Sequence, residues 1–530
     1  LNKNRNINND FIDCLLDNKK IKNYEIPTEI NATLRKYQQE GVNWLLFLQE
    51  YGLHGALCDD MGLGKTLQTI CAVSAVQFKN NKIPSLVVCP PSLIGHWENE
   101  IKSFSSFLKP LQFHSKNKKD WPLNQSTSNY NVFICSFDFL RNNLHYFKKF
   151  NYNYFILDEG HVIKNPKTKI SLAVKSIVAK HRLVLTGTPI QNNILELWSI
   201  FDFLMPGFLG SEQEFNEKYV KPIKMKINEN KMVKMNEAGV IALDGLHRQM
   251  LPFMLRRIKD QVLNDLPPKI MQDYYCSLSK IQSKIYEQIE LDEIHVFQSL
   301  QELRRLITHP LLLKDERIEV VNVETNSLPT SVPSNSSLMD QLEVSGKFVA
   351  LKQLLIDCGI SPDNNLSPHR ILIFVQLKST LDLIENILFK PHFPFISYLR
   401  LDGSVDSTKR IDIVSKFNSD PSIDCLILTT QVGGLGLNLT GADTVIFMEH
   451  DWNPMKDLQA MDRAHRIGQK KVVNVYRLIC KDTLEEKILN LQKFKLAVAN
   501  SVVNEQNSST SSMNTSELID LFKKENNKKV

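Results

Sequence analysis

Two parts of the chain alternate short apolar runs with segments of helical periodicity. In the first part the runs are His54–Cys58, Ser85–Cys89, Asn131–Cys135, Tyr154–Leu157 and Arg182–Leu185. The same rhythm restarts near residue 370, with runs at Arg370–Val375, Ile396–Leu401, Asp424–Leu428, Thr444–Met448 and Val472–Ile479. Apolar strands that alternate with helices are typical of a parallel sheet covered on both faces. The pattern therefore predicts an α/β fold class with two lobes, each a parallel sheet flanked by helices.

The regions outside these two parts are patterned differently. Apolar residues fall on one helical face near residues 34–48, and a mostly helical stretch occupies about 195–310. Residues 322–342 are rich in Ser, Asn, Thr, Val and Pro, which is typical of a flexible linker or a surface insertion. We expect an N-terminal extension at 1–30, a first lobe at 31–255 with a helical insertion at about 195–255, a linker with a helical insertion and a flexible segment at 256–345, a second lobe at 346–500, and a tail at 501–530 with a short amphipathic helix.

Composition narrows the class of protein without deciding its function. At 530 residues the chain is too long for a single core. Hydrophobic residues make up 42% and charged residues 23%, which is the balance of an ordinary soluble globular protein. No apolar run approaches the about 20 residues that a transmembrane helix needs, and no signal-peptide core is present. Because the chain does not begin with Met, we expect it to be part of a longer one.

Charge and cysteine usage add two weaker indications. The net charge of +6, with a pI of about 8.6, permits nucleic-acid binding but does not require it. The nine cysteines are scattered, contain no Cys-x-x-Cys pair, and in several cases lie in the strand-like runs. Buried free thiols in a reducing compartment explain them better than a zinc site does.

The strongest chemical signal is a glycine loop between an apolar run and a helix-like run, Asp59-Asp60-Met61-Gly62-Leu63-Gly64-Lys65-Thr66. In this context such a loop cradles nucleotide phosphates with its backbone N–H groups at a helix N-terminus. Lys65 would reach the β- and γ-phosphates, and the Thr66 hydroxyl would take one Mg²⁺ coordination position. All eight residues are therefore candidate ATP-binding residues. Asp59 stands where the usual pattern has Gly, and an unrelated surface turn is the alternative.

Two adjacent acids, Asp158 and Glu159, end the apolar run Tyr154–Leu157. Asp158 would hold Mg²⁺, directly or through water, and Glu159 would orient the attacking water. Phosphoryl transfer needs both parts, because its catalysis is mostly positioning and charge stabilisation. A solvated acidic turn explains the pair taken alone, but the phosphate loop upstream favours the catalytic interpretation.

A third candidate element lies in the second lobe, in the segment Gln459-Ala460-Met461-Asp462-Arg463-Ala464-His465-Arg466. If this segment is helical, Gln459, Arg463 and Arg466 share one stripe, because spacings of four and three stack on a helix. Gln459 would then join the nucleotide-binding residues, and both arginines would act as arginine fingers on the γ-phosphate. Spacing alone favours an exposed basic face, and the other two motifs reverse that preference.

These motifs, in this order, resemble the SWI/SNF-like family of superfamily-two DNA translocases. Further motifs of the family are Leu34-Arg35-Lys36-Tyr37-Gln38, Cys89-Pro90-Pro91-Ser92-Leu93, Leu185-Thr186-Gly187-Thr188-Pro189, Ile373-Phe374, Thr429-Thr430-Gln431-Val432-Gly433 and Asp451-Trp452-Asn453-Pro454. The resemblance covers roughly residues 30–500. It implies two RecA-like lobes, with ATP in a cleft, Gln38 on the adenine edge, and double-stranded DNA across both lobes.

The resemblance also implies DNA-backbone contacts at Pro90, Pro91, Ser92, Ser136, Thr429, Thr430, Gln431 and Gly433. Phosphate contacts carry no sequence information, which suits a motor that steps along any DNA. Thr186, Gly187 and Thr188 would couple the nucleotide state to the grip on DNA. Helix caps and ordinary turns are the alternatives for such Ser, Thr and Gly residues. Arg256 and Arg257 fit a clamp on the second lobe or DNA, and equally a solvated face.

Finer details resemble one branch of this family, the ATPases that remove the TATA-binding protein (TBP) from DNA. These details are Gly160 where most relatives have Ala, Val162-Ile163-Lys164-Asn165, Leu266-Pro267-Pro268-Lys269-Ile270, Glu449-His450-Asp451-Trp452 and Leu491-Gln492-Lys493-Phe494-Lys495. In that branch a long helical-repeat region, which the present sequence does not contain, grips TBP. The resemblance therefore implies double-stranded DNA and TBP as partners, a nuclear location, and no membrane.

The sequence thus predicts a DNA-dependent ATPase, helicase-like but without strand separation, with ATP and Mg²⁺ as cofactors. Its expected function is to move along DNA, displace TBP and so regulate transcription. Two alternatives stay open. One is a nucleosome-remodelling or recombination-type translocase of the same family, and the other is a non-catalytic scaffold with an inactive ATPase fold. The intact Lys65, Asp158, Glu159, Arg463 and Arg466 argue against the scaffold.

Overall fold

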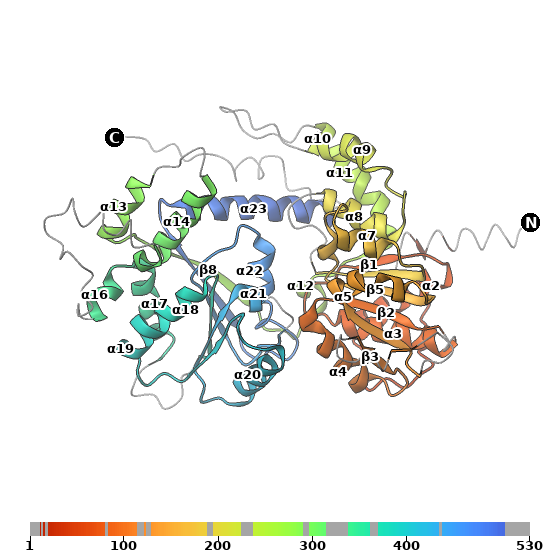
Figure 1. Cartoon of the computed structure of the whole chain (residues 1–530), viewed down its shortest axis with the longest axis horizontal. Helices are drawn as coiled ribbons and strands as arrows, with labels where there is room; N and C mark the ends of the chain where they lie inside the picture. Colours follow the sequence, from red (N-terminus) through yellow and green to blue (C-terminus); the bar gives the residue numbers. More distant parts are fainter. Residues whose placement is uncertain are drawn as a thin grey trace, which may run out of the picture. The chain divides into compact units, whose positions relative to one another are not determined.

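A computed structural model describes residues 11, 14, 15, 20–79, 83–113, 121–122, 129–187, 194–223, 237–289, 296–313, 338–360, 369–433 and 437–503. The chain divides into two compact units, Leu1–Asn264 with Leu496–Val530, and Asp265–Lys495. Each unit has its own sheet with helices around it (Figure 1). Thr188 of the predicted coupling motif and the amphipathic helix expected in the tail lie outside the described residues.

The first unit is built on a seven-stranded sheet in the order β3-β4-β2-β5-β6-β1-β7. All neighbouring strands pair in parallel. The strands are β1 (Gly55–Leu57), β2 (Ser85–Cys89), β3 (Pro110–Gln112), β4 (Val132–Ser136), β5 (Tyr152–Asp158), β6 (Ala179–Leu185) and β7 (Met254–Leu255). Parallel neighbours need crossover connections, and helices in these connections help to bury both faces of the central strands β2, β4 and β5.

The helices of the first unit follow the strands in chain order. They are α2 (Lys36–Glu50), α3 (Lys65–Lys79), α4 (Ile94–Phe104), α5 (Phe137–Asn142), α6 (Leu144–Phe147), α7 (Lys169–Lys175), α8 (Leu195–Leu204), α9 (Glu212–Phe215), α10 (Lys221–Ile223), α11 (Glu237–Met250) and α12 (Lys259–Val262). Trp44 of α2, Ile70 of α3 and Ile156 of β5 are among the fully buried residues of one core cluster. The helix that carries the candidate loop is therefore fixed to the sheet by packing.

The second unit has a six-stranded parallel sheet in the order β10-β11-β9-β12-β13-β8. The strands are β8 (Lys269–Cys276), β9 (Ile371–Val375), β10 (Tyr398–Leu401), β11 (Cys425–Thr429), β12 (Thr444–Phe447) and β13 (Val473–Cys480). Alternate residues of the central strand β9 enter different cores: Ile371, Ile373 and Val375 join one cluster, and Leu372 and Phe374 the other. Because both faces of this strand pack against apolar side chains, its residues form one continuous apolar run in the sequence.

The helices of the second unit are α13 (Lys280–Gln288), α14 (Val296–Thr308), α16 (Leu338–Glu343), α17 (Gly346–Asp357), α18 (Lys378–Leu383), α19 (Lys390–His392), α20 (Ser407–Ser419), α21 (Thr430–Gly433) and α22 (Pro454–Met461). The helix α23 (Leu484–Val503) starts in this unit and ends in the part assigned to the first. In the described part of the chain, we find no helix with the length and apolar character needed to span a membrane.

The predicted fold class is confirmed, and each predicted apolar run overlaps a strand. Three strands were not predicted: β3, β7 and β8. The last two lie within the stretch 195–310 that we expected to be mostly helical. The residues 265–345, expected to form a linker and insertion, cluster with the second unit and supply its edge strand β8. The exact domain limits given from the sequence stay a prediction.

Candidate nucleotide-binding site

The glycine loop 59–64 lies between the carboxyl end of β1 and the first residue of α3, Lys65. Gly62 and Gly64 have φ angles of 86° and 78°, in the left-handed region that glycine adopts without strain. These two positions turn the chain from the strand into the helix. The loop is thus at a helix N-terminus, where backbone N–H groups and the helix dipole favour an anion.

The side chain of Lys65 lies along this loop. Its Nζ donates hydrogen bonds to the carbonyl oxygens of Asp59, at 2.6 Å, and of Asp60, at 3.2 Å. Gln38 is buried at the base of the loop, where its Nε2 donates to the Leu63 carbonyl at 3.3 Å. The structure therefore brings the predicted glutamine motif and phosphate loop together, while contact of Gln38 with adenine stays a prediction.

The carboxylate of Asp59 is fully buried and is occupied within the protein. Oδ1 accepts from Arg257 Nε at 2.9 Å, and Oδ2 accepts from Arg257 Nη2 and from Gln68 Nε2. A role for Asp59 in nucleotide binding therefore rests on its backbone. The solvated-face alternative is wrong for Arg257, because its side chain is buried against this loop, while the clamp stays a prediction.

Asp158 ends β5, and its two oxygens have different partners. Oδ2 accepts a hydrogen bond from Trp97 Nε1 at 2.8 Å, and Oδ1 accepts from the Glu159 N–H at 2.9 Å. Burial and the neighbouring Glu159 carboxylate raise the pKa of Asp158 to about 6, against the lowering effect of Trp97 and of the Lys65 charge. The strands β5 and β1, which lead to the two acids and to the phosphate loop, are each paired with β6, so both parts lie at one edge of the sheet.

The backbone at Glu159 is strained. Its φ of 56° lies in the left-handed region, which a residue with a side chain rarely adopts, and such strain is concentrated at functional sites. The Glu159 carboxylate lies 3.3 Å from His161 Nδ1. At Gly160, an added Cβ would come within 2.2 Å of Val184 on β6, which explains why glycine follows the two acids.

The predicted coupling motif borders the phosphate loop. The Thr186 N–H donates to the Leu57 carbonyl at 3.2 Å, which continues the pairing of β6 with β1. A Cβ at Gly187 would meet Met61 Cγ at 2.9 Å and Lys65 Nζ at 3.7 Å. These two residues are therefore next to the loop, as a coupling role requires.

The donor set of the site suits Mg²⁺. The Thr66 hydroxyl at the start of α3 and the Asp158 carboxylate supply hard oxygen atoms, which Mg²⁺ prefers. Mg²⁺ in nucleotide sites takes most of its other ligands from phosphates and water. Within the described ranges no group of three or more His, Cys, Asp or Glu side chains has a metal-binding arrangement.

The expected helical stripe of Gln459, Arg463 and Arg466 is wrong. The helix α22 ends at Met461, so both arginines lie in the turns that follow it. After the helix, the Arg463 N–H donates to the Ala460 carbonyl at 3.2 Å, and the Arg463 carbonyl accepts from the Leu439 N–H at 3.0 Å. Arg463 is buried and Arg466 is half-buried. The finger role remains a prediction without the helical spacing that suggested it.

The predicted DNA-contacting residues fall into two groups. Pro91 and Gln431 are exposed, and Pro90 and Ser92 are half-buried, at the ends of β2 and β11. In contrast, the Ser136 hydroxyl accepts from the Phe139 N–H at 3.2 Å as the cap of α5, and the Thr430 hydroxyl donates to the Val375 carbonyl at 3.1 Å. Thr429 is buried, and Gly433 ends α21. The Ser136 contact matches the helix-cap alternative, whereas the Thr430 hydroxyl is bonded to the end of the neighbouring strand β9.

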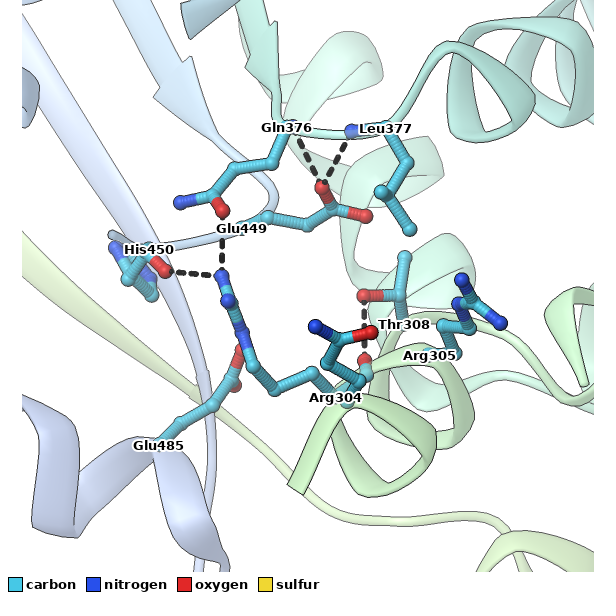
Figure 2. A pocket seen from close by; sticks show the side chains of 9 residues that line it. Arg304, Arg305, Thr308, Gln376, Leu377, Glu449, His450 and Glu485 are labelled. Atoms are coloured by element: carbon cyan, nitrogen blue, oxygen red, sulfur yellow. Dashed lines mark hydrogen bonds between the residues drawn. The ribbon is translucent and has the colours of Figure 1, made fainter. Parts of the chain in front are cut away.

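A separate polar cavity of about 200 Å³ lies within the second unit, beside α14 (Figure 2). Arg304 reaches from this helix and donates to Gln376 Oε1 at 2.6 Å and to the His450 carbonyl at 2.7 Å. Glu449 accepts from the N–H groups of Gln376 and Leu377. Figure 2 shows that these contacts join α14 to the residues that follow β9 and β12. The sequence did not point to Arg304, because its partners are distant along the chain.

All nine cysteines are free thiols, and eight of them are buried. Burial raises the pKa of Cys58 and of Cys71 to about 12, which makes these thiols unreactive. This confirms the prediction that the cysteines of the strands are buried free thiols.

Comparison with known families and proteins gives matches over most of the chain. The SNF2-related domain matches residues 37–322, and the helicase conserved C-terminal domain matches residues 346–468. The chain is 52% identical to TATA-binding protein-associated factor 172 of Homo sapiens over 97% of this chain and 30% of that protein. It is 52% identical to TATA-binding protein-associated factor MOT1 of Saccharomyces cerevisiae over 98% of this chain and 30% of that protein.

More distant matches were also found. Nuclear protein STH1/NPS1 of S. cerevisiae is 33% identical over 89% of this chain and 35% of that protein. Among solved structures, the Sulfolobus solfataricus SWI2/SNF2 ATPase core in complex with dsDNA is 33% identical, with a TM-score of 0.44 over 91% of this chain and 95% of the other. The chain spans about 30% of the length of the two TATA-binding protein-associated factors named above.

Proposed function

Because the chain belongs to the SNF2-related family, we propose that it is an ATP-dependent double-stranded DNA translocase that displaces TBP from DNA and so regulates transcription. The proposal rests on the arrangement of the candidate nucleotide-binding site in the first unit. There the phosphate loop with Lys65, the Asp158–Glu159 pair and the Thr186–Gly187 turn meet at the carboxyl ends of neighbouring parallel strands. Nucleotides bind at this edge of parallel α/β sheets.

In this proposal the loop N–H groups at the start of α3 hold the phosphates of ATP. Lys65 Nζ exchanges the carbonyl oxygens of Asp59 and Asp60 for phosphate oxygens, so its present bonds keep it close to its working position. Mg²⁺, held by Thr66 and Asp158, would neutralise charge on the phosphates. Glu159 orients the attacking water, and the hydrogen bond from Trp97 fixes the Asp158 carboxylate beside it.

In this proposal the loops at the ends of β2 and β11 contact the DNA backbone. The Ser92 hydroxyl oxygen is buried and has no hydrogen-bond partner among the described residues, and Pro91 next to it is exposed. In this proposal the turn shifts on DNA and uncovers that hydroxyl, so that a phosphate oxygen accepts from it. Such contacts are independent of base sequence, as translocation along DNA requires.

The removal of TBP is proposed because of the names of the proteins to which this chain is most similar among those compared above. Two proteins named TATA-binding protein-associated factor are 52% identical to this chain, while a protein named as a chromatin-remodeling subunit is 32% identical. The higher identity favours TBP over nucleosomes as the displaced substrate. The relative named nuclear protein STH1/NPS1 supports a nuclear location. We propose that TBP is recognised by a region outside these 530 residues, since the two TATA-binding protein-associated factors are much longer than this chain.

The decisive experiment uses the full-length protein that contains this chain. Release of labelled TBP from a TATA duplex is measured with and without ATP, beside a Glu159→Gln variant that keeps the fold and binds ATP without hydrolysing it. ATP-dependent release that the variant lacks supports the proposal. DNA-stimulated hydrolysis without release would transfer the proposal to nucleosomes or another DNA-bound protein, and absence of hydrolysis would indicate an inactive scaffold.

A further inference from the structure

A buried carboxylate at the first position of a phosphate loop is electrostatically unfavourable for binding a triphosphate. Asp59 is such a residue, because its side chain is fully buried and its carbonyl oxygen lies 2.6 Å from Lys65 Nζ. Like charges in a site of low dielectric constant repel strongly. The protein must therefore neutralise Asp59 if the loop is to bind ATP.

Arg257 supplies this neutralisation. Its guanidinium bonds to both carboxylate oxygens of Asp59, through Nε and Nη2, and its backbone N–H donates to Oδ1 at 3.1 Å. The Arg257 side chain is itself buried, and Nη2 also donates to Gln68 Oε1 at 2.7 Å. A two-pronged arrangement of this kind fixes the orientation of both partners as well as their charge.

The backbone around Arg257 follows the loop as well. The segment 255–259, which we call the strap, continues the pairing of β7 with β1. The Cys58 N–H donates to the Leu255 carbonyl at 2.7 Å, and the Asp60 N–H donates to the Arg257 carbonyl at 2.9 Å. The Lys259 N–H donates to Asp60 Oδ2 at 3.2 Å. The first residues of the phosphate loop are thus shaped by the strap.

A glycine in α2 leaves room for this network. A Cβ added at Gly41 would come within 1.9 Å of Gln68 Oε1 and 2.8 Å of Arg257 Nη2. Glycine in a helix interior costs about 1 kcal/mol relative to alanine, so its presence indicates a need for close approach. Gln68 belongs to α3, and so the network connects α2, α3, the loop and the strap.

The strap emerges from the helical insertion of the first unit. The chain passes from α11 through Leu251–Phe253 into β7, and Arg257 follows two residues later. Arg257 and Asp59 are 198 residues apart in the sequence. Any partner that displaces the end of this insertion would act directly on the entrance of the phosphate loop.

From these contacts we infer that Arg257 is a positioning residue for ATP, which holds the phosphate loop through Asp59 and removes the charge that would repel the phosphates. This inference rests on the proposed ATPase function. Arg257 acts through the loop and does not itself contact the nucleotide. Its loss therefore weakens ATP binding more than it slows turnover at saturating ATP.

Three variants of the complete chain test the inference: Arg257→Gln, Asp59→Asn, and the two combined. The measured quantities are the KM for ATP and kcat of DNA-stimulated hydrolysis, and the Kd of a fluorescent ADP derivative. Arg257→Gln leaves the carboxylate unpaired beside the phosphates, so its KM and Kd should rise by at least about 10-fold with kcat changed by less than about threefold. Asp59→Asn removes the negative charge but also weakens the two-pronged contact that holds the loop, so it should raise both constants by a smaller factor than Arg257→Gln does. The combined variant has no unpaired carboxylate beside the phosphates, so both constants should lie clearly below those of Arg257→Gln, although the lost positioning of the loop keeps them above those of the original protein.

A matched control separates this effect from general loss of stability. Lys175 and Asp202 form a half-buried ion pair in the same unit, at 2.5 Å, and take no part in the site. Lys175→Gln should lower the melting temperature without changing the KM for ATP. If Arg257→Gln does not fold, Arg257→Lys takes its place, since it keeps the charge but loses the two-pronged geometry, and should raise KM by a smaller factor.

The outcomes distinguish the two levels of the argument. If the protein without any substitution neither binds nor hydrolyses ATP, the proposed function itself is overturned. Normal hydrolysis by the original protein, with an unchanged KM in the folded Arg257 variants, would overturn the role of Arg257 alone. Equal weakening by Arg257→Gln and by the combined variant would also overturn it, because charge neutralisation requires rescue.

Discussion

We expect that loss of the hydrogen bond from Trp97 to Asp158 lowers the rate of ATP hydrolysis. Trp97 is buried on α4, which follows directly after the predicted DNA-contacting turn Pro91–Leu93. Its indole Nε1 donates to Asp158 Oδ2 at 2.8 Å. Trp97→Phe keeps an aromatic ring in the core and removes this donor, so it tests whether the bond positions the carboxylate for catalysis.

The expected magnitude follows from the type of bond. A hydrogen bond to an ionised group contributes about 1.5–3 kcal/mol. If this energy is needed to hold Asp158 in its working orientation, turnover should fall by a factor of about 10 to 150. The half-saturating Mg²⁺ concentration should rise as well, because Asp158 is a candidate Mg²⁺ ligand. Loss of ring volume adds a destabilisation of about 1–2 kcal/mol that is common to any buried Trp→Phe change.

Trp198 provides a matched control in the same unit. It is also buried, and its Nε1 donates to the Gly210 carbonyl at 3.0 Å, away from the nucleotide site. Trp198→Phe should lower stability to a similar extent without changing the Mg²⁺ requirement. The assay is DNA-stimulated ATP hydrolysis as a function of Mg²⁺, together with Mg²⁺-dependent binding of a fluorescent ADP derivative, below the melting temperatures of both variants.

Two results would refute the reasoning. Equal loss of turnover in Trp97→Phe and Trp198→Phe would mean that stability, and not the position of Asp158, limits the reaction. A normal turnover and Mg²⁺ requirement in a folded Trp97→Phe variant would show that Asp158 needs no help from the indole.

Three further predictions concern the second unit. Replacing Arg463 and Arg466 with Gln should spare ATP binding and lower turnover by a factor of about 10³ or more, and unchanged turnover would contradict the finger role. Lys347→Met should destabilise the unit by about 3–5 kcal/mol, measured by urea unfolding, because the fully buried Lys347 Nζ bonds to Glu485 Oε1 and its removal leaves a buried carboxylate unpaired; a loss below about 1 kcal/mol would contradict this account. Burial lowers the pKa of His309 to about 4, so the unfolded chain takes up a proton there before the folded one as the pH falls from about 6.5 to 4, and stability should decrease by about 3 kcal/mol over that range. His309→Gln should reduce the acid dependence of the melting temperature, and an identical dependence in the variant would refute this assignment.

Most of the fold was predictable because its central strands are buried on both faces. Such strands appear as short apolar runs, and the alternation of β9 between two core clusters explains why no polar residue interrupts it. The edge strand β8 was missed for the opposite reason: Ile270, Met271 and Tyr275 are exposed, mixed with polar residues, and lie in a stretch of helical character. The two-residue strand β7 is too short to show any periodicity.

The residues of the candidate site also fall into two groups: those that a local sequence motif predicts, and those that are brought in from distant parts of the chain. The phosphate loop and the Asp158–Glu159 pair are encoded by contiguous residues, whose order alone indicates strand, turn and helix. The side chains that orient them are not. Trp97 is 61 residues from Asp158 along the chain and Arg257 is 198 residues from Asp59, so no local pattern could connect them. The helix assumed for Arg463 ends at Met461, and the Arg463 carbonyl is bonded to Leu439, which the local sequence around Arg463 does not indicate.

Three residues of the site depart from local rules, and two of these departures are compensated by a contact from elsewhere. Asp59 replaces the usual loop glycine and is neutralised by Arg257. Gly41 is unfavourable in the interior of its helix, but its lack of a side chain makes room for Gln68. Glu159 adopts a left-handed φ, while its N–H donates to Asp158 and orients that carboxylate. Departures from local preference are expected where function demands them, and here each one positions either the phosphate loop or the acidic pair. The geometry of the site is therefore fixed before a nucleotide arrives, which reduces the ordering that binding must supply.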